Sequence, residues 1–308
     1  MPLVNGGEGG DDLTRGRCAT QKPRMLDFDP ARPAATPRDA STVLVLRSSD
    51  TTGSVEIFCV QRHPRSGFLG GAVVFPGGKL DAADGDPAWL PSVTSPAPRS
   101  ESFETPQARA HALAIAACRE LLEEAAILPV VGDAIDDEAA LSLRAKVRAG
   151  SSLREELARQ GLVLDIGRLV PFGRWVTPEA ESRRFDARFY MLPLPAGQRG
   201  HHDAHETTTS FWATPASVLE RWMAGEISMA PPTTRALELL SSVRSVEEAL
   251  ALAGAQSLLP ICPLFVADET APFLALPGDP AHPIAERRID GATRFVMRDG
   301  RFVSETSS

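Results

Sequence analysis

Two short apolar runs near the start of the chain have the pattern of buried strands. STVLVLRSS covers residues 41–49, SVEIFCVQR covers residues 54–62, and both are rich in β-branched residues. The turn-forming letters DTTG lie between them. We therefore predict a β-hairpin at the start of the ordered part of the chain.

A long helical pattern follows a loop that is rich in proline and serine. The segment QARAHALAIAACRELLEEAAIL, residues 107–128, consists mostly of strong helix formers. Thr105 suits the N-cap, Pro106 suits the first turn, and Pro129 cannot continue the helix. The pattern predicts a helix over the whole segment and a surface loop over residues 85–104 before it.

The rest of the chain alternates between strand and helix patterns. Two helices are expected within residues 134–160, broken at GSS, with Ser152 and Glu155 as a capping box. Further strands are expected at LVPFGRWVTP, RRFDARFYMLPL and TTTSFWATP, and further helices at ASVLERWMAGE, APPTTRALELL and SVEEALALAG. TRFVMRDGRFVSE predicts a hairpin with Asp-Gly at its turn. This order indicates a mixed α/β sandwich with a C-terminal elaboration.

The same pattern divides the chain into three parts. Residues 1–40 are rich in Gly, Pro, Asp and Arg and lack apolar periodicity, so we expect a flexible N-terminal arm. Residues 41–230 are expected to form the main domain, with the loop at 85–104 inside it. Residues 231–308 are expected to form a C-terminal extension that packs on this domain.

Charge and composition narrow the classes of function. The net charge is −8, from 32 basic and 40 acidic residues, which disfavours a long nucleic acid because such binding depends on basic surface. A small phosphorylated substrate is compatible with this charge.

No apolar run approaches the roughly 18 residues of a membrane span. The ends of the chain show neither a secretory signal nor a peroxisomal address. We expect a cytoplasmic protein without a membrane partner, and the sequence leaves its oligomeric state open, a homodimer included.

Three glutamates on the predicted long helix are candidates for metal binding. Glu120, Glu123 and Glu124 have i, i+3, i+4 spacing, which places all three on one helix face. Like charges at this spacing repel, whereas a divalent cation would reverse the sign of that interaction. The alternative interpretation is an ordinary solvated face, since runs such as RELLEE are common on exposed helices.

The glycine turn upstream makes the metal interpretation more specific. FPGGKLDAAD at residues 75–84, followed later by RELLEEAAI, resembles the Nudix box, which runs from a glycine to an R-E-x-x-E-E helix. An uninterrupted box leaves thirteen residues between that glycine and the arginine, whereas forty lie between Gly78 and Arg119. Tripling a loop adds only about 1 kcal/mol of closure entropy, so the box tolerates the insertion.

Several further motifs are similar to one branch of the Nudix family, which has an interrupted box and contains a peroxisomal coenzyme A diphosphatase. They are WVTP at 175–178, RRFD at 183–186 and LPGD at 276–279. The resemblance implies a Nudix α/β/α sandwich with a mixed sheet and a helical C-terminal elaboration. It also implies hydrolysis of a diphosphate with Mg²⁺ or Mn²⁺ as cofactor.

The resemblance also implies roles for individual residues. The metal would be held by the carboxylates of the box and by the backbone of its glycine: Glu120, Glu123, Glu124 and Gly78. The catalytic residues would be Glu120 and Glu124, Arg119 as the residue that orients Glu120, and Glu206 in HETTTSFW. The alternative for Glu206 is an acid in an exposed loop.

Two positions depart from the box. Asp84 replaces its first glutamate, a position that is more structural than catalytic in the family. Ala126 replaces its last glycine. If this position required a positive φ, alanine would cost about 1 kcal/mol. We expect the helix to continue to Pro129 instead.

The candidate substrate contacts are glycine backbone and arginine side chains: Gly77, Gly78, Arg62, Arg65 and Arg184. Arg62 and Arg65 lie in QRHPRSGFLGG, where the alternative interpretation is that both belong to a solvated turn.

The leading hypothesis is hydrolysis of coenzyme A or acyl-coenzyme A to 3′,5′-ADP and (acyl-)phosphopantetheine. One alternative is a Nudix pyrophosphatase acting on ADP-ribose, NADH or another nucleoside diphosphate derivative. Another is a Nudix-fold binding or regulatory module without turnover.

Overall fold

The computed structural model describes residues 27–66, 69–103, 106–203, 207–268 and 270–307. Strands β1 (Arg38–Ser48) and β2 (Val55–Arg62) form the predicted antiparallel hairpin, with Leu46 opposite Ile57. Side chains along a strand alternate between its faces. Val43 and Val45 enter one hydrophobic core, while Leu44 and Leu46 enter another. Because both faces of β1 are apolar, the sheet needs a covering layer on each side.

The main sheet is mixed and has seven strands. It adds β3 (Val73–Val74), β4 (Gly77–Lys79), β5 (Val170–Val176), β6 (Phe185–Pro193) and β7 (Thr207–Ala213) to the hairpin. The order is β3-β2-β1-β6-β5, with β4 also paired to β1 and β7 also paired to β2. Only the β1–β6 pairing is parallel among these strands.

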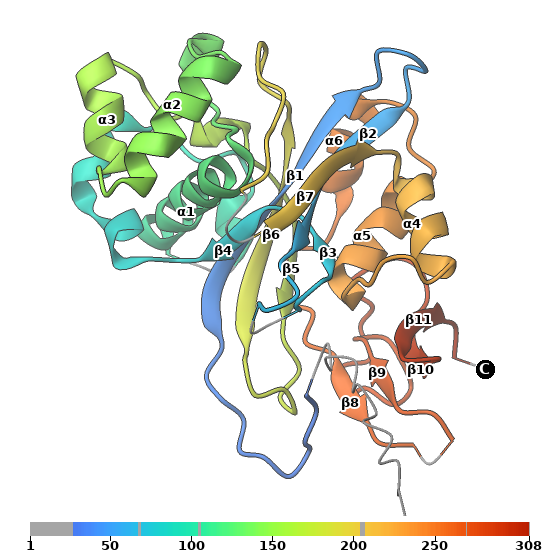
Figure 1. Ribbon diagram of the computed structural model, residues 1–308. Coiled ribbons are helices and arrows are strands. Elements are labelled where there is room, and N and C mark those ends of the chain that lie inside the picture. The colour runs from blue at the N-terminus through green and yellow to red at the C-terminus, as the bar shows by residue number, and fades with distance from the viewer. Residues whose placement is uncertain (1–26, 67–68, 104–105, 204–206, 269, 308) are drawn as a thin grey trace, which may run out of the picture.

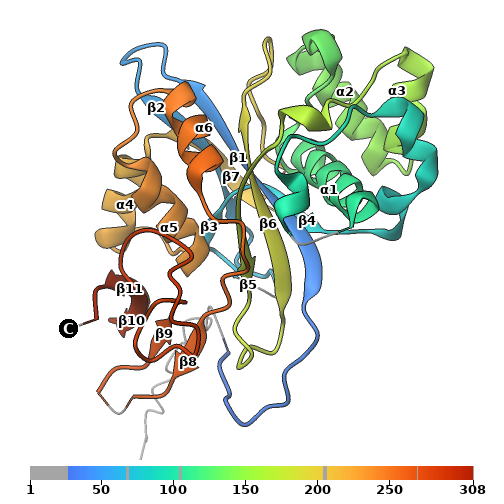
Figure 2. The same cartoon turned by 180° about the vertical axis from the view of Figure 1, so that it is seen from behind.

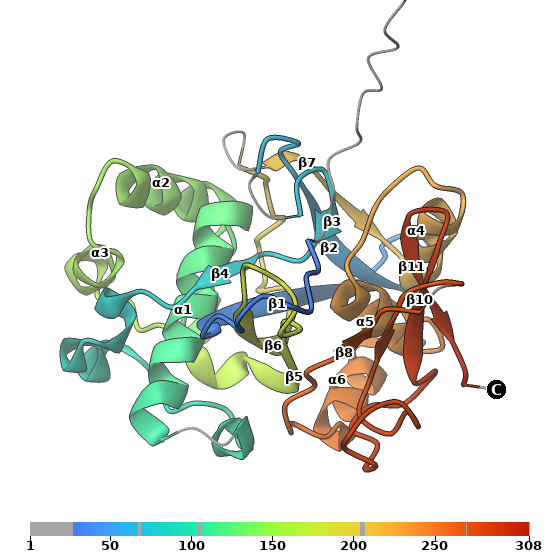
Figure 3. The same cartoon turned by 90° about the horizontal axis from the view of Figure 1, so that it is seen from below.

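Helices cover both faces of this sheet. On one face lie α1 (Gln107–Ala125), α2 (Asp137–Arg148) and α3 (Leu153–Gln160), and on the other lie α4 (Pro215–Met223), α5 (Pro231–Leu240) and α6 (Val246–Ala255). Figure 1 shows the sheet between these two layers, and Figures 2 and 3 show the same layers from behind and from below. The α/β/α sandwich expected from the sequence is confirmed.

Helix α1 is shorter than predicted at its C-terminal end. It ends at Ala125, and Ala126 takes a left-handed conformation with φ 51° and ψ 39°. The turn sends Ile127 and Leu128 into the core, and Gln198 donates to and accepts from the backbone of Leu128. The expectation that the helix continues to Pro129 was therefore wrong, because this burial outweighs the cost of a positive φ at alanine. Thr105, the predicted N-cap, lies outside the described residues.

The insertion between the two halves of the box is more ordered than a surface loop. It contains three short 3₁₀ helices, at Ala82–Gly85, Pro87–Ser92 and Ser100–Phe103. Trp89 and Phe103 are buried in the core beside α1, and the ring of Phe103 meets Tyr190 edge to face. The expectation of a loop at 85–104 is corrected here, because these two aromatic side chains hold the described part of the segment against the domain.

The segment before β1 is also held by the fold from Asp27 onward. The backbone N–H of Asp27 donates to Glu181, and that of Asp29 donates to the carbonyl of Ala180. Strand β1 begins at Arg38, three residues before the expected start of the domain at 41. The described part of the expected arm is therefore packed against the turn between β5 and β6.

The C-terminal region consists of helices followed by a second sheet. Strands β8 (Leu264–Val266), β9 (Phe273–Ala275), β10 (Arg294–Arg298) and β11 (Arg301–Glu305) pair in the order β11-β10-β9-β8. The predicted Asp-Gly hairpin joins β10 to β11, and Asp299 and Gly300 both have positive φ. The elaboration is thus helical only in its first part.

A buried aspartate in the LPGD motif fastens this second sheet. Asp279 accepts hydrogen bonds from Thr293 at 2.8 Å and from Arg294 at 2.9 Å through each of its two carboxylate oxygens. Burial alone would raise the pKa of Asp279, but these bonds lower it overall. The native state therefore gains stability above the pKa of an unfolded aspartate and loses it as the pH falls through the lower folded value.

We expect Asp279→Asn to lower the free energy of unfolding by about 3 kcal/mol, because Arg294 loses the charge of its buried partner. Urea denaturation at pH 7 measures this change, and Asp50→Asn at an exposed turn is the matched control. Below about pH 4, the stability of the wild type should approach that of the variant. A difference that stays constant down to pH 2 would contradict the proposed role of the ionised carboxylate.

Candidate active site

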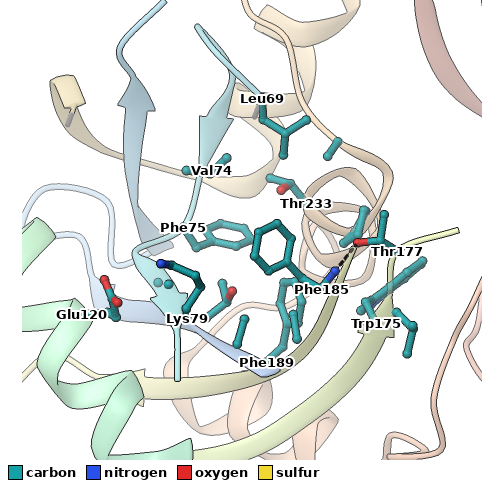
Figure 4. Close-up of a pocket in the computed structure, with 18 of the residues that line it drawn as sticks. Leu69, Val74, Phe75, Lys79, Glu120, Trp175, Thr177, Phe185, Phe189 and Thr233 are labelled. Carbon is teal, nitrogen blue, oxygen red and sulfur yellow. Dashed lines mark hydrogen bonds between the residues drawn. The ribbon is translucent and has the colours of Figure 1, made fainter. Parts of the chain in front are cut away.

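A pocket of about 450 Å³ lies between α1, strands of the main sheet and the C-terminal region. One part of it is lined by Arg119 and the glutamates of α1, and another by apolar side chains from several separate segments of the chain. Figure 4 shows Glu120 on one side of the pocket and Trp175 on the opposite side, with Phe75, Phe185 and Phe189 between them. A volume of this size suits a small organic ligand.

The predicted carboxylate face lies in this pocket. Glu120, Glu123 and Glu124 all line it, as their spacing on one helix face predicts. Their environments differ, because the side chain of Glu123 is 33% exposed and that of Glu120 is 15% exposed, whereas Glu124 is 4% exposed as a residue. Glu124 accepts a hydrogen bond of 3.0 Å from the backbone N–H of Gly77. This bond fixes its carboxylate against the glycine turn.

Glycine is required at positions 77 and 78 because other atoms lie too close for a Cβ atom, and not because the backbone angles there exclude other residues. A Cβ atom on Gly78 would lie closer than 3.0 Å to the carboxylate of Glu120. A Cβ atom on Gly77 would lie equally close to the backbone of Ser41 and Thr42 on β1. Neither glycine has a positive φ. Gly78 therefore makes room for the side chain of Glu120, whereas Gly77 makes room for the pairing of β4 with β1.

Arg119 joins the two halves of the interrupted box. Its guanidinium forms two bonds of 2.9 Å with the buried carboxylate of Asp84. The same group bonds to Glu120 and to the carbonyl of Lys79, each at 2.9 Å. Burial lowers the pKa of Arg119, but the bonds and charges of Asp84 and Glu120 outweigh this and raise it, so the guanidinium keeps its charge. This geometry agrees with the predicted orienting role of Arg119 and gives Asp84 its structural function.

The donor set fits a hard divalent cation in its chemistry. Three carboxylates from one helix face line a single pocket, and such oxygen donors are the ligands that Mg²⁺ prefers. In this structure the described residues contain no group of three His, Cys, Asp or Glu side chains gathered to hold a metal ion. Glu120 is directed toward Arg119, and Glu124 toward the N–H of Gly77. Their carboxylates would have to turn to share one ion.

The structure separates the three candidate arginines. Arg62 lines the pocket, and its buried Nε finds no hydrogen-bond partner among the described residues. Arg65 is exposed and is not part of the pocket wall. Arg184 is buried and donates to the carbonyls of Thr177 at 3.0 Å and Ala35 at 2.7 Å. We therefore correct the assignment of Arg184, because its guanidinium is engaged by backbone carbonyls and Arg184 itself is not among the residues that line the pocket. Glu206 lies outside the described residues.

The apolar part of the pocket was not predicted from the sequence. Phe185, Ala187 and Phe189 occupy every second position of β6, and all three line the pocket. This period of two predicts that they share one face of the strand, but it does not predict that the face belongs to a pocket. Phe28 and Leu274 lie far from the box in the sequence and carry no local signal for a binding site.

The described part of the chain has no helix that is both long enough and apolar enough to cross a membrane.

Comparisons with known proteins agree with this geometry. The family model described as the NUDT19 Nudix domain matches residues 37–240. The acyl-coenzyme A diphosphatase NUDT19 of Gallus gallus is 30% identical over 327 residues, covering 85% of each chain. The Homo sapiens protein of the same name is 29% identical over 269 residues, covering 72% of this chain and 71% of the relative. A crystal structure of a NUDIX hydrolase from Alicyclobacillus acidocaldarius matches with a TM-score of 0.59 and 27% identity, covering 70% of this chain and 96% of that one. The chain therefore belongs to the NUDT19 branch of the Nudix hydrolases and is a Nudix diphosphatase.

Proposed function

We propose that the protein hydrolyses the diphosphate of coenzyme A or an acyl-coenzyme A in a reaction that depends on Mg²⁺ or Mn²⁺. The products would be 3′,5′-ADP and phosphopantetheine or its acyl ester. The observation that carries the proposal is a single pocket with the box glutamates in one part and an aromatic wall in another. Such a pocket suits a ligand that joins a diphosphate to a long, largely apolar group. The names of the chicken and human relatives, both acyl-coenzyme A diphosphatases, support the same substrate class.

The carboxylates of α1 would bind the cation, and the residues around them set their positions. When bound, a divalent cation would neutralise the diphosphate oxygens and orient the attacking water. Glu120, Glu123 and Glu124 would hold it, together with the backbone of Gly78. Of these, Glu120 and Glu124 are the candidates to take the proton of the water, because they accept bonds of 2.9 and 3.0 Å from Arg119 and Gly77, whereas the bond from Arg119 to Glu123 is longer, at 3.5 Å.

Arg62 is the side chain that we assign to a phosphate group of the substrate. Its partly buried guanidinium lines the pocket and leaves one buried N–H donor without an acceptor among the described residues. A buried donor without a partner is unfavourable unless a ligand or water satisfies it. A phosphate oxygen is a suitable acceptor, since guanidinium and phosphate form strong charge-assisted bonds.

We expect Arg62→Ala to raise the KM for coenzyme A by about tenfold or more, in line with the loss of a charge-assisted bond. Arg65→Ala is the matched control, because Arg65 is exposed and absent from the pocket wall. Initial rates with coenzyme A and with dephospho-coenzyme A measure the effect. A loss confined to coenzyme A would assign Arg62 to the 3′-phosphate, and an equal loss on both would assign it to the diphosphate. Equal KM values for the two variants would contradict the assignment.

The function itself is tested by a hydrolysis panel with chromatographic separation of the products. The substrates are coenzyme A, an acyl-coenzyme A, ADP-ribose, NADH and a nucleoside triphosphate, each with Mg²⁺, with Mn²⁺ and with EDTA. We expect 3′,5′-ADP to form fastest, and only with metal. Faster cleavage of ADP-ribose or NADH would keep the chemistry and change the substrate. Absence of turnover with either metal would favour a binding role.

A further inference from the structure

The aromatic wall of the pocket offers little to a polar ligand. Thr177 lies in this wall beside Trp175 and Phe185 (Figure 4). Its N–H donates to the carbonyl of Phe185 at 2.9 Å, its hydroxyl accepts from the N–H of Phe185 at 3.0 Å, and its carbonyl accepts from Arg184. The polar groups of Thr177 are thus engaged by the protein. A nucleobase would find few hydrogen-bond partners at this wall, whereas a hydrocarbon chain needs none.

Phe28 belongs to the same end of the pocket. It lines the pocket and stacks on Phe265, with ring centroids 4.7 Å apart and planes inclined by 13°. Phe265 is paired with Leu274 across β8 and β9, and Leu274 is also a pocket residue. Phe28 also forms a β-bridge with Glu181, in the turn that follows Pro178 of the wall. These contacts join Phe28 to the C-terminal sheet and to the turn after Pro178, and none of them involves α1.

Two aromatic rings contact the ring of Phe28, and hydrogen bonds hold the backbone on both sides of it. The edge of the ring meets Phe302 of β11 at a centroid distance of 5.8 Å, in addition to the stack on Phe265. On the backbone, Asp27 donates to the buried carboxylate of Glu181 at 2.7 Å, and Asp29 donates to Ala180 at 2.8 Å. A side chain fixed in this way forms a wall that a ligand cannot easily displace.

We propose that the apolar end of the pocket binds the acyl group of an acyl-coenzyme A and that Phe28 limits the length of that group. The inference rests on the proposed function and makes it more specific, because it names the part of the substrate that this end receives. It assigns Phe28 as a specificity-determining residue, supplied by a segment that lies outside the matched Nudix domain at 37–240.

The test compares free coenzyme A with acetyl, hexanoyl, octanoyl, decanoyl and lauroyl esters below their micelle concentrations. Values of kcat/KM are measured with Mg²⁺, and Kd is measured by calorimetry in EDTA, where turnover is absent. For the wild type, we expect affinity to rise by up to about fourfold per buried methylene until the chain reaches Phe28, and then to level off. In Phe28→Ala the plateau should move to longer chains. The first ester beyond the wild-type plateau should bind at least about fivefold tighter to the variant than to the wild type, as burial of further methylenes predicts.

Two further variants test whether the effect of Phe28→Ala comes from loss of the pocket wall or from a general effect on folding. Phe28→Leu keeps most of the volume and should retain the wild-type length profile. Phe211→Ala removes an aromatic ring on β7 that is not part of the pocket wall, and it should leave the profile unchanged. Equal affinity of the wild type for coenzyme A and all its esters would overturn the proposal. An unchanged plateau in Phe28→Ala would also overturn it, even with hydrolysis of coenzyme A intact. If no coenzyme A compound binds or reacts, the proposed function falls as well.

Discussion

Glu124→Gln is expected to lower kcat for diphosphate hydrolysis by roughly a thousandfold, which is within the range for loss of a group that acts on a proton or a metal. The substitution removes the charge of the most buried of the three box glutamates but keeps its size. The amide oxygen of glutamine can still accept the bond that Gly77 now donates at 3.0 Å. The fold should therefore be retained, and a steady-state assay together with a thermal melt separates the two effects.

The matched control for this variant is Glu138→Gln, which neutralises an exposed acid in the first turn of α2. It should keep the activity of the wild type. A titration of Mg²⁺ against each variant adds a second measurement, because removal of a ligand weakens metal binding. Full activity of Glu124→Gln would remove this residue from the catalytic set, and a large drop in melting temperature would make its role structural.

Gly78→Ala is expected to lower mainly the activity, whereas Gly77→Ala is expected to lower mainly the stability. The Cβ atom that alanine adds at position 78 would collide with the carboxylate of Glu120, which is the end of a flexible side chain and can turn away. A displaced catalytic group of this kind costs roughly a hundredfold in rate, with little loss of stability. The Cβ atom that alanine adds at position 77 would collide with the backbone of β1, which cannot move alone. This collision should lower the free energy of unfolding by about 2 kcal/mol.

The pair of variants needs two measurements on the same preparations. Chemical denaturation gives the free energy of unfolding, and initial rates per folded molecule give the activity. The expected result is a stable but slow Gly78→Ala and a less stable Gly77→Ala. If Gly78→Ala is as active as the wild type, the position of Glu120 shown here is not the one used in catalysis. If both variants are equally destabilised, the two glycines share one structural function.

Local features of the sequence were sufficient for most elements of the fold. The hairpin of β1 and β2, the pair of helices α2 and α3, and the Asp-Gly hairpin at the end of the chain occur where they were predicted. Their signals are short-range, because alternation, N-caps and turn residues act between neighbours along the chain. Ser152 caps α3 by accepting from the N–H of Glu155, which is one half of the expected capping box.

Errors arose where distant parts of the chain meet. The helical pattern of α1 continues past Ala125, but the burial of Ile127 and Leu128 turns the chain there. Trp89 and Phe103 stand in a segment whose proline and serine content indicates a loop, yet both side chains enter the core. No short-range signal reports such burial, because it depends on the surfaces of other elements.

The candidate arginines show the same limit. Arg62 and Arg184 both stand beside apolar strand patterns, and a guanidinium is an equally good phosphate ligand in either place. In the fold, Arg184 donates to backbone carbonyls of Ala35 and Thr177, whereas Arg62 lines the pocket with one buried N–H that lacks a partner among the described residues. A structural arginine differs from a candidate phosphate ligand only in whether other segments of the chain place hydrogen-bond acceptors beside its guanidinium.

The sequence by itself determined that Glu120, Glu123 and Glu124 share one helix face, because this spacing follows from the helical repeat alone. The resemblance of the interrupted motif to the Nudix box, and not the spacing, implied what these carboxylates do. The sequence also indicated that the glycine turn belongs to the same site, although it did not show why glycine is required there. The tertiary structure decided that Gly77 is required by contact with β1 and Gly78 by contact with Glu120. It also decided the shape of the apolar end, which combines side chains as distant in sequence as Phe28 and Leu274. A wall assembled from separate segments exists only when the chain is folded, because its residues become neighbours through packing and not through sequence.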